Sequence, residues 1–296
     1  MPEICSPVST PPLVPPSGRG RGRVPASVVV ASVVLLTLAV ASGLYAATGS
    51  DLHNRTDLLA RLSSPGTNSP WIGIHLAGTD ELGRDVLLRS LMGSAISFGV
   101  ALAGVLGGCL IGILIGILAG YRGGWVDRAL MVLVDAQLAL PNLLLILCGI
   151  ALLGTSVWVL IAMISLSRWE TYARLTRSLV LSARERDYVD AVRAIGGGTL
   201  RTVFIHILPN IASPLWVMLT LSFPAVMLTE AGLSFLGVGV QPPTPSLGRM
   251  VAEGRNQLIM APWVAGVPAL FIVAITLSVQ LIGDWLRDRA DVRAPT

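Results

Sequence analysis

The sequence predicts an all-α membrane protein with six transmembrane helices. Of its 296 residues, 53% are hydrophobic and only 13% are charged, and the mean hydropathy of +0.73 indicates more apolar surface than a single soluble core can bury. The apolar residues also form uncharged runs of about 20 residues or more, the length that an α-helix needs to cross about 30 Å of hydrocarbon. The clearest run is Leu91 to Gly120, which contains no Asp, Glu, Arg or His.

The first 90 residues are predicted to contain one span between two extramembrane segments. Residues 1–23 hold six prolines and end in three closely spaced arginines, a composition that predicts a disordered cytoplasmic tail. Residues 24–47 are the predicted first transmembrane helix. They contain a motif like a signal-peptide cleavage site, but the apolar stretch is longer than a signal peptide needs. Residues 48–90 mix charges with turn-forming residues, which favours an ordered extracytoplasmic segment.

The second and third spans carry glycine and proline at informative positions. In the second span, Ser97 to Tyr121, the six glycines from Gly104 to Gly120 recur largely at four-residue intervals, so one face of the helix can approach a neighbouring helix closely. We expect that face to be a helix interface. The third span, about Ala129 to Leu153, contains Pro141, which removes a backbone donor and is expected to kink the helix.

Three further spans complete the predicted set of six. The fourth, about Val157 to Ser167, is short, and its helix is expected to continue a few residues further with its charged residues at the interface. The fifth runs from about Ile211 to Leu233 and the sixth from about Val264 to Trp285. Residues 91–296 thus form the predicted transmembrane domain, in which residues 168–201 are a long cytoplasmic loop between spans four and five.

The arginines predict the orientation of these spans, because positively charged loops are retained in the cytoplasm. With the N-terminal tail inside, 15 of the 21 arginines lie in cytoplasmic segments and six lie outside. Both termini are therefore predicted to be cytoplasmic.

The absence of lysine limits the chemistry of the chain. All 21 basic residues are arginine, so the chain offers no P-loop lysine for nucleotide phosphates and no lysine amine for Schiff-base chemistry. The three cysteines and three histidines are scattered and show no metal-type spacing. We expect no catalytic residues and no metal site in this chain.

The long cytoplasmic loop contains the most informative segment. Residues 183–195 predict a helix with Val189, Val192 and Ile195 on one side and charged residues on the other, and the glycine run that begins at Gly196 ends it. This pattern is typical of a helix that lies at an interface or docks a partner.

The segment DYVDAVRAIGGGTLRTVFIHILPN resembles the EAA loop of ABC importer permeases, whose pattern is EAA, three residues, glycine, and then I-x-L-P. Asp190, Ala191 and Val192 take the EAA positions, and Gly196 takes the glycine position. The Asp, the Val and His206 depart from the usual residues, which affects the detail of docking and not the spacing. The resemblance implies that an ATPase docks here, on Tyr188, Val189, Asp190, Ala191, Val192, Ala194, Ile195 and Gly196.

Two more stretches, GTDELGRDVLLRSLMGSAISF at 78–98 and AGLSFLGVGVQPPTPSLGRMVAEGR at 231–255, are similar to the second-type, C-like permease subunit of dipeptide, oligopeptide and nickel importers. The resemblance covers roughly residues 74–292 and implies the type I permease fold of ABC importers, with residues 168–201 as the coupling loop. It implies alternating-access import of di- or oligopeptides across the bacterial cytoplasmic membrane. The implied partners are a second, homologous permease, two ATPase subunits that bind ATP and Mg, and an extracytoplasmic solute-binding protein.

Two acidic residues fall inside the predicted spans, where a charge is costly unless it is paired or hydrated. Asp135 lies about two turns inside the third span, where it could line the pathway, contact the partner permease or bond to a neighbouring helix. Glu230 lies near the outer end of the fifth span, where an interface role is expected.

The sequence leaves alternatives open for the cargo and the mechanism. Nickel or a nickel chelate is the alternative cargo within the same family, and nothing in the chain names the substrate. An ion-coupled transporter would work without an ATPase. An intramembrane enzyme would need paired catalytic groups within the spans, whereas Asp135 is predicted to be alone at its depth.

Overall fold

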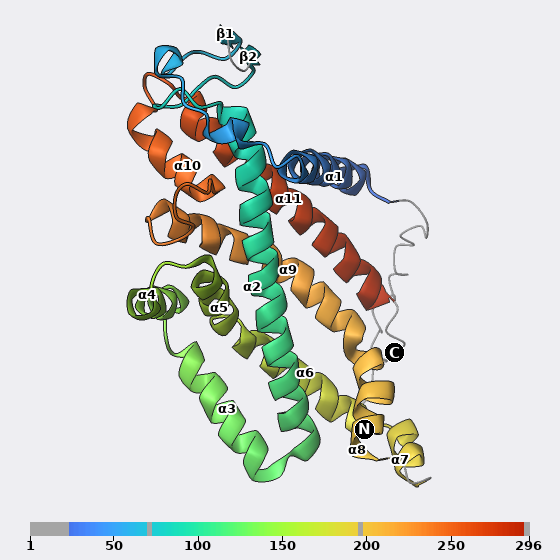
Figure 1. The fold of residues 1–296 in the computed structure, drawn as a ribbon. Coiled ribbons are helices and arrows are strands. Elements are labelled where there is room, and N and C mark those ends of the chain that lie inside the picture. Colours follow the sequence, from blue (N-terminus) through green and yellow to red (C-terminus); the bar gives the residue numbers. More distant parts are fainter. Residues whose placement is uncertain (1–23, 70–72, 195–197, 293–296) are drawn as a thin grey trace, which may run out of the picture.

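The computed structural model describes residues 24–69, 73–194 and 198–292. Its helices form an elongated bundle around α2, with a small extramembrane segment at one end (Figure 1). The four helices that are long and apolar enough to cross a membrane lie at Ala26–Ala47 (α1), Val86–Arg122 (α2), Thr199–Phe235 (α8, a π-helical turn and α9 together) and Trp263–Arg289 within α11 (Trp263–Val292). The shorter helices are Gly124–Leu138 (α3), Asn142–Leu153 (α4), Val157–Leu166 (α5), Trp169–Arg184 (α6), Asp187–Ala194 (α7) and Leu247–Gly254 (α10).

The central helix α2 packs closely on α5 and α6 through its glycines. A side-chain carbon on Gly116 would lie 2.6 Å from the carbonyl oxygen of Ala173 on α6, and one on Gly120 would lie 3.0 Å from the carbonyl oxygen of Arg177. Only glycine allows backbones to approach this closely. The prediction that the glycine face of the second span is a helix interface is therefore confirmed, and its partners are the consecutive helices α5 and α6, which run parallel to α2 along this face.

The third predicted span is bent much more sharply than a proline kink. Its two halves, α3 and α4, meet at 90° across a short break. Pro141 is the residue that caps the start of α4, with a φ of −62°. Because proline lacks the backbone donor, the helix that arrives from α3 ends before Pro141 and a new helix begins after it. Figure 1 shows α4 nearly end-on above the upper end of the oblique helix α3.

The fourth predicted span differs from the expectation. The helix α5 has only 10 residues and ends at Ser167 and Arg168, after which α6 continues as a separate helix of 16 residues. Thus the first half of the predicted loop 168–201 is a helix of the bundle. By length and composition, four helices of the described residues can cross a membrane, or five if α3 and α4 count as one span, so the predicted count of six is not confirmed.

The fifth span begins earlier than predicted. It starts as the single turn α8 (Thr199–Arg201), passes through a π-helical turn at Thr202–Ile207, and continues as α9 (Leu208–Phe235). Pro209 lies in the first turn of α9, where its missing donor removes one α-helical bond, as expected next to a π-helical turn. This turn joins α9 to the segment that contains α7.

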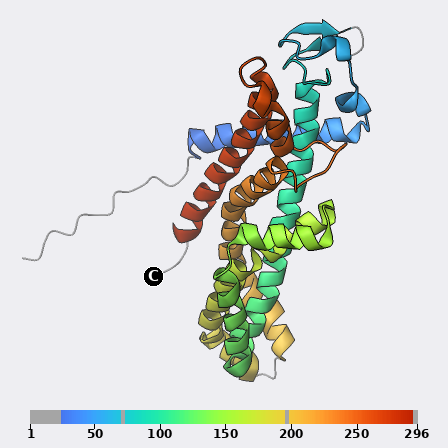
Figure 2. The same cartoon turned by 90° about the vertical axis from the view of Figure 1, so that its left-hand side faces the viewer.

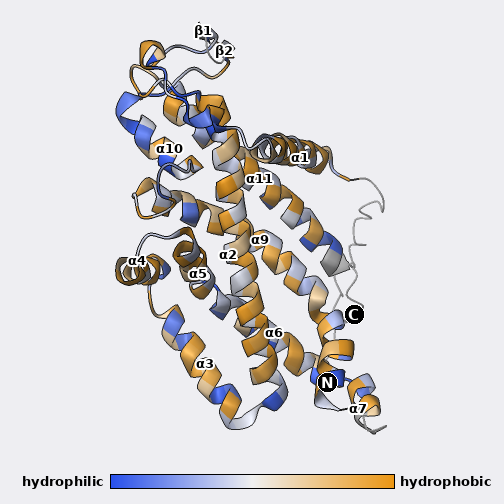
Figure 3. Ribbon diagram, in the orientation of Figure 1, coloured by the Kyte–Doolittle hydropathy of each residue, from blue (hydrophilic) through white to orange (hydrophobic). Residues whose placement is uncertain are grey.

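The predicted extracytoplasmic segment is ordered and folds over the ends of α2 and α11. It contains two 3-10 turns, Asp51–Asn54 and Leu58–Ala60, and a small antiparallel hairpin of β1 (Thr67–Ser69) and β2 (Gly73–His75). The hairpin is the one departure from an all-α fold within the described residues. Polar residues gather at this end of the bundle and on α10, whereas apolar residues cover the helices between the two ends (Figure 3).

The first helix lies differently from the other long helices. In Figure 2, α1 crosses α2 and α11 at a steep angle. It is joined to α2 by a hydrogen bond of 2.6 Å between the hydroxyls of Ser42 and Ser94, both buried. Most of its remaining side chains are exposed on this chain, so α1 presents apolar surface to whatever surrounds the bundle.

Candidate coupling site and polar residues of the bundle

The short helix α7 is held against the end of the bundle that lies opposite α10. Its Val189 is fully buried and belongs to an apolar cluster with residues of α6, the π-helical turn and α9. The chain enters α7 directly from α6, since the amide of Arg186 donates to the carbonyl of Ala183 at 3.3 Å. The helix α7 is therefore in direct packing contact with α6 and α9.

The neighbouring residue Arg184 fixes this corner to α2. Its guanidinium donates to the carbonyl oxygens of Gly120 and Tyr121, both at 3.3 Å. These carbonyls lie in the last turn of α2, where acceptors lack partners within the helix and a cation is favoured. Arg184 therefore joins the end of α2 to the start of the segment that contains α7.

The opposite side of α7 faces away from the bundle. Ala191 is exposed and Val192 is half-buried, while Tyr188 is half-buried beside the apolar cluster. The predicted docking residues thus divide into an anchor, Val189, and an outward surface around Ala191. The backbones of Asp190 and Ala194 belong to α7, their side chains are outside the description, and Ile195 and Gly196 lie outside the described residues.

Asp135 bonds to a neighbouring helix, which is one of the three roles that the sequence left open for it. Its carboxylate accepts a hydrogen bond of 2.6 Å from Arg174, which lies on α6 and not in an open loop. The expectation that Asp135 is alone at its depth is wrong, because helix α6 continues alongside α3. Both side chains are more than half exposed on this chain, so the pair faces lipid, water or a partner.

Two further polar contacts join α3 to α6 on either side of that pair. Together with Arg174, the α6 residues that make these contacts are spaced about one helical turn or more apart along α6. Towards the α7 end the guanidinium of Arg177 donates to the carboxylate of Asp127 at 2.6 Å, and towards α5 the indole of Trp169 donates to the amide oxygen of Gln137 at 2.7 Å.

Two acidic side chains are buried inside the bundle. Glu230 on α9 is fully buried and accepts a hydrogen bond of 2.7 Å from the hydroxyl of Ser234. The same hydroxyl accepts the amide of Val240 at 3.2 Å, so Glu230 helps to hold the loop after α9 onto the bundle. Glu170 on α6 is also buried. Sequence reasoning missed it because it placed that residue at the membrane surface.

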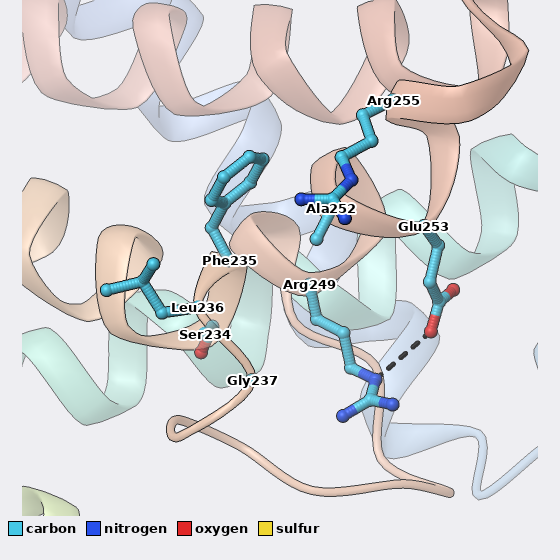
Figure 4. A pocket seen from close by; sticks show the side chains of 8 residues that line it. All are labelled: Ser234, Phe235, Leu236, Gly237, Arg249, Ala252, Glu253 and Arg255. Atoms are coloured by element: carbon cyan, nitrogen blue, oxygen red, sulfur yellow. Dashed lines mark hydrogen bonds and ion pairs between the residues drawn. The ribbon is translucent and has the colours of Figure 1, made fainter.

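A cavity of about 360 Å³ lies at the α10 end of the bundle, between the end of α9 and α10. Arg249, Glu253 and Arg255 contribute its charged side chains (Figure 4). Sequence reasoning did not single out these residues, although two arginines and a glutamate within seven residues were a visible signal. Within the described residues, no three His, Cys, Asp or Glu side chains meet in a way that could hold a metal ion.

Comparison with known proteins places this geometry in a family. Residues 112–294 match the family described as "Binding-protein-dependent transport system inner membrane component". The di/tripeptide transport system permease protein DppC of Pseudomonas aeruginosa is 44% identical over 216 residues, which cover 73% of this chain and 71% of that protein. The glutathione transport system permease protein GsiD of Pectobacterium atrosepticum is 35% identical, with 87% of this chain and 84% of that protein covered.

Two further comparisons extend the likeness. The oligopeptide transport system permease protein OppC of Bacillus subtilis is 32% identical, with 88% of this chain and 83% of that protein covered. Among solved structures, an inward-facing form of the MetNI methionine ABC transporter has a TM-score of 0.54 at 18% identity, and the match covers 69% of this chain and 95% of that chain. The structural likeness shows a shared fold.

Proposed function

The chain belongs to the family of inner membrane components of binding-protein-dependent transport systems, and from this premise we propose that it is the permease subunit of an ATP-driven importer of di- or oligopeptides. The observation that carries the proposal is the 44% identity to a di/tripeptide permease over most of both chains. The relatives reported above are named for peptides or glutathione, so peptides are favoured over nickel as the cargo.

The ATPase docks on α7 in this proposal. The outward surface around Ala191 is exposed, and the anchor Val189 connects α7 to α6 and α9. When two ATPase subunits close on ATP, a docked α7 moves with them and transfers the movement into the bundle. ATP and Mg are bound by those subunits, because the sequence of this chain contains no lysine for a P-loop.

The α7 end is cytoplasmic and the α10 end is extracytoplasmic in this proposal. Arginines support the orientation, since residues 168–201, which lead through α6 to the α7 end, contain seven of them and the turn between α2 and α3 adds Arg122 and Arg128, whereas six lie in the segments around β1, β2 and α10. An extracytoplasmic solute-binding protein then delivers cargo at the α10 end, and both termini of the chain are cytoplasmic.

A second permease completes the translocation path. In Figure 1 the helices α3, α4 and α5 lie on one side of α2, and the exposed pair of Asp135 and Arg174 belongs to that side. Large apolar side chains of the same helices, including Leu152 and Trp158, are also exposed on this chain. We infer that this face meets the second permease and the cargo.

The test is to express the chain with its genomic neighbours, purify it through a tag and reconstitute the complex in proteoliposomes. An ATPase and a second permease are expected to co-purify, and uptake of a radiolabelled tripeptide is expected to require ATP and the binding protein. Ala191→Trp is expected to reduce co-purification of the ATPase and uptake at least tenfold, while the permease still inserts in the membrane. Peptide uptake that continues without any ATPase would show an ion-coupled transporter and overturn the proposal.

A further inference from the structure

The cavity between the end of α9 and α10 carries an excess of positive charge. Glu253 is its one acidic side chain, and both oxygens of that carboxylate are already occupied. Its Oε1 accepts a hydrogen bond of 3.0 Å from Nε of Arg249, and its Oε2 accepts one of 3.2 Å from Arg89. Arg84 lies 3.7 Å from the same Oε2. Glu253 is thus shared among three guanidinium groups.

The remaining acid of this network does not balance the charge. Asp80 is buried and accepts from both Arg84, at 2.8 Å, and Arg89. Three arginines therefore share the carboxylates of Asp80 and Glu253, and the network keeps one uncompensated positive charge. Arg249 is the arginine of this network that faces the cavity.

Arg255 adds a second positive charge to the cavity. Its guanidinium lies 6.0 Å from the ring centre of Phe235, and within the described part of the chain no carboxylate lies at ion-pair distance from it. In Figure 4 its side chain is directed towards Phe235, whereas Glu253 is turned towards Arg249. Arg249 donates to Glu253 through Nε alone. The two terminal nitrogens of its guanidinium group can therefore donate to another acceptor.

The shape of the cavity favours a small anionic molecule. Its volume of about 360 Å³ lies within the range of small-molecule pockets, which combine apolar walls with a few placed polar groups. Phe235, Leu236 and Ala252 supply apolar wall beside the two guanidinium groups. A planar guanidinium fork matches a carboxylate in geometry and charge.

We propose that this cavity binds the free C-terminal carboxylate of a peptide as the peptide enters the permease, with Arg249 and Arg255 as its ligands. The inference rests on the proposed function and adds to it a site on the permease itself that selects peptides with a free carboxyl terminus. The cavity lies at the α10 end, on the side of α2 where α4 and α5 also lie (Figure 1), so a peptide held there is placed at the entrance to the path.

The test compares a tripeptide with the same tripeptide amidated at its C terminus, in proteoliposomes that hold the complete importer and its binding protein. Both peptides are supplied above their separately measured dissociation constants for the binding protein. The wild-type importer is expected to take up the free acid faster, and Arg249→Gln/Arg255→Gln is expected to slow the free acid about tenfold, the loss that follows when a charge-assisted hydrogen bond is removed. Uptake of the amide is expected to change less than twofold.

Two controls keep the result specific. Arg255→Gln alone removes a guanidinium that has no ion pair among the described residues, so it leaves the network of Asp80 and Glu253 intact. This single variant replaces the double variant if the latter does not assemble, and it is expected to show the same selective loss of free-acid uptake. Arg61→Gln removes an exposed charge elsewhere in the predicted extracytoplasmic segment and is expected to change the uptake of neither peptide.

Two outcomes would overturn the proposal. Equal losses of uptake for the acid and the amide would show that the arginines act on the binding protein, and unchanged uptake of both would show that the cavity binds no carboxylate. If the wild-type importer takes up neither peptide, the proposed function itself fails.

Discussion

Arg174 of α6 donates a hydrogen bond of 2.6 Å to the carboxylate of Asp135 on α3, and both side chains are more than half exposed on the isolated chain. An ion pair in this setting contributes little to stability in water, about 0 to 1 kcal/mol. Because the pair lies on the face with α4 and α5, we propose that it acts in transport.

We expect Asp135→Asn and Arg174→Gln each to lower peptide uptake several-fold while the melting temperature of the purified permease changes by only a few degrees. The reversed pair, Asp135→Arg with Arg174→Asp, is expected to recover part of the uptake because the attraction is restored. Scintillation counting of uptake and a thermal melt measure the two effects. A large loss of thermal stability with the single changes would show a structural pair and not a transport role.

Because α2 packs closely on α6, a glycine-to-alanine substitution in α2 is expected to destabilise the protein at some positions and not at others. Gly116→Ala would place a methyl group 2.6 Å from the carbonyl of Ala173, so the helices must separate, whereas Gly99 has open space around it on this chain. Overpacking of this kind costs about 1 to 3 kcal/mol. We expect Gly116→Ala to lower the thermal stability in detergent by several degrees, and Gly99→Ala to serve as the matched control with no change. Equal melting temperatures for the two variants would be inconsistent with close packing at Gly116.

Val189 and Ala191 on α7 are expected to respond to substitution in different ways. Val189 is fully buried and Ala191 is exposed. Val189→Ala removes two methyl groups from the cluster and is expected to destabilise the isolated permease by about 1 to 3 kcal/mol, measured by denaturation in detergent. Ala191→Trp is expected to leave that stability unchanged. A loss of stability with Ala191→Trp would place Ala191 inside the fold and weaken its assignment to the docking surface.

The predicted extracytoplasmic segment contains a buried ion pair. Arg89 is almost fully buried and bonds to Asp80, and removal of one partner of such a pair leaves an uncompensated charge that costs about 3 to 5 kcal/mol. We expect Asp80→Asn to expose residues 48–85 to limited proteolysis, with Asp51→Asn as the exposed control. Resistance to protease equal to that of the wild type would show that Asp80 is dispensable for this segment.

Glu230 is expected to act through a hydrogen bond and not through its charge. The carboxylate accepts the hydroxyl of Ser234 on one oxygen, an interaction that the amide oxygen of Gln also offers. We therefore expect Glu230→Gln to keep uptake within about twofold and Glu230→Leu to lower both uptake and thermal stability. If Glu230→Gln loses uptake as completely as Glu230→Leu, the charge of the side chain is required.

Much of the architecture was predictable because hydropathy and glycine spacing are local signals. The glycine face of α2, the break at Pro141 and the family all follow from residues close together in the sequence. The fold of α5 and α6 did not follow, because α6 alternates apolar residues with Arg174 and Arg177 and resembles a surface helix when its neighbours are unknown. Only the packing of α6 on the glycines of α2 shows that it belongs to the bundle.

The candidate site could be predicted from the sequence where one local motif defines it, and not where distant segments form it. The spacing around Ala191 predicts a docking segment without any structure, and the docking itself stays a prediction. The cavity near α10, by contrast, combines the end of α9 with Arg249 and Arg255, and its charge balance depends on Arg84 and Arg89 near the start of α2. A local sequence pattern does not predict contacts between residues so far apart in the chain, so the excess of positive charge is evident only from the structure.

The uninterrupted length of α2 has a mechanical consequence. Its 37 residues contain no proline and extend for about 55 Å, from the outer segment at Val86 to the carbonyls held by Arg184. We infer that such a rod tilts as one piece, and a tilt of about 10° around its middle would displace its two ends by roughly 5 Å in opposite directions. Cargo binding at one surface of the membrane and ATP hydrolysis at the other would then both be linked to the tilt angle of α2.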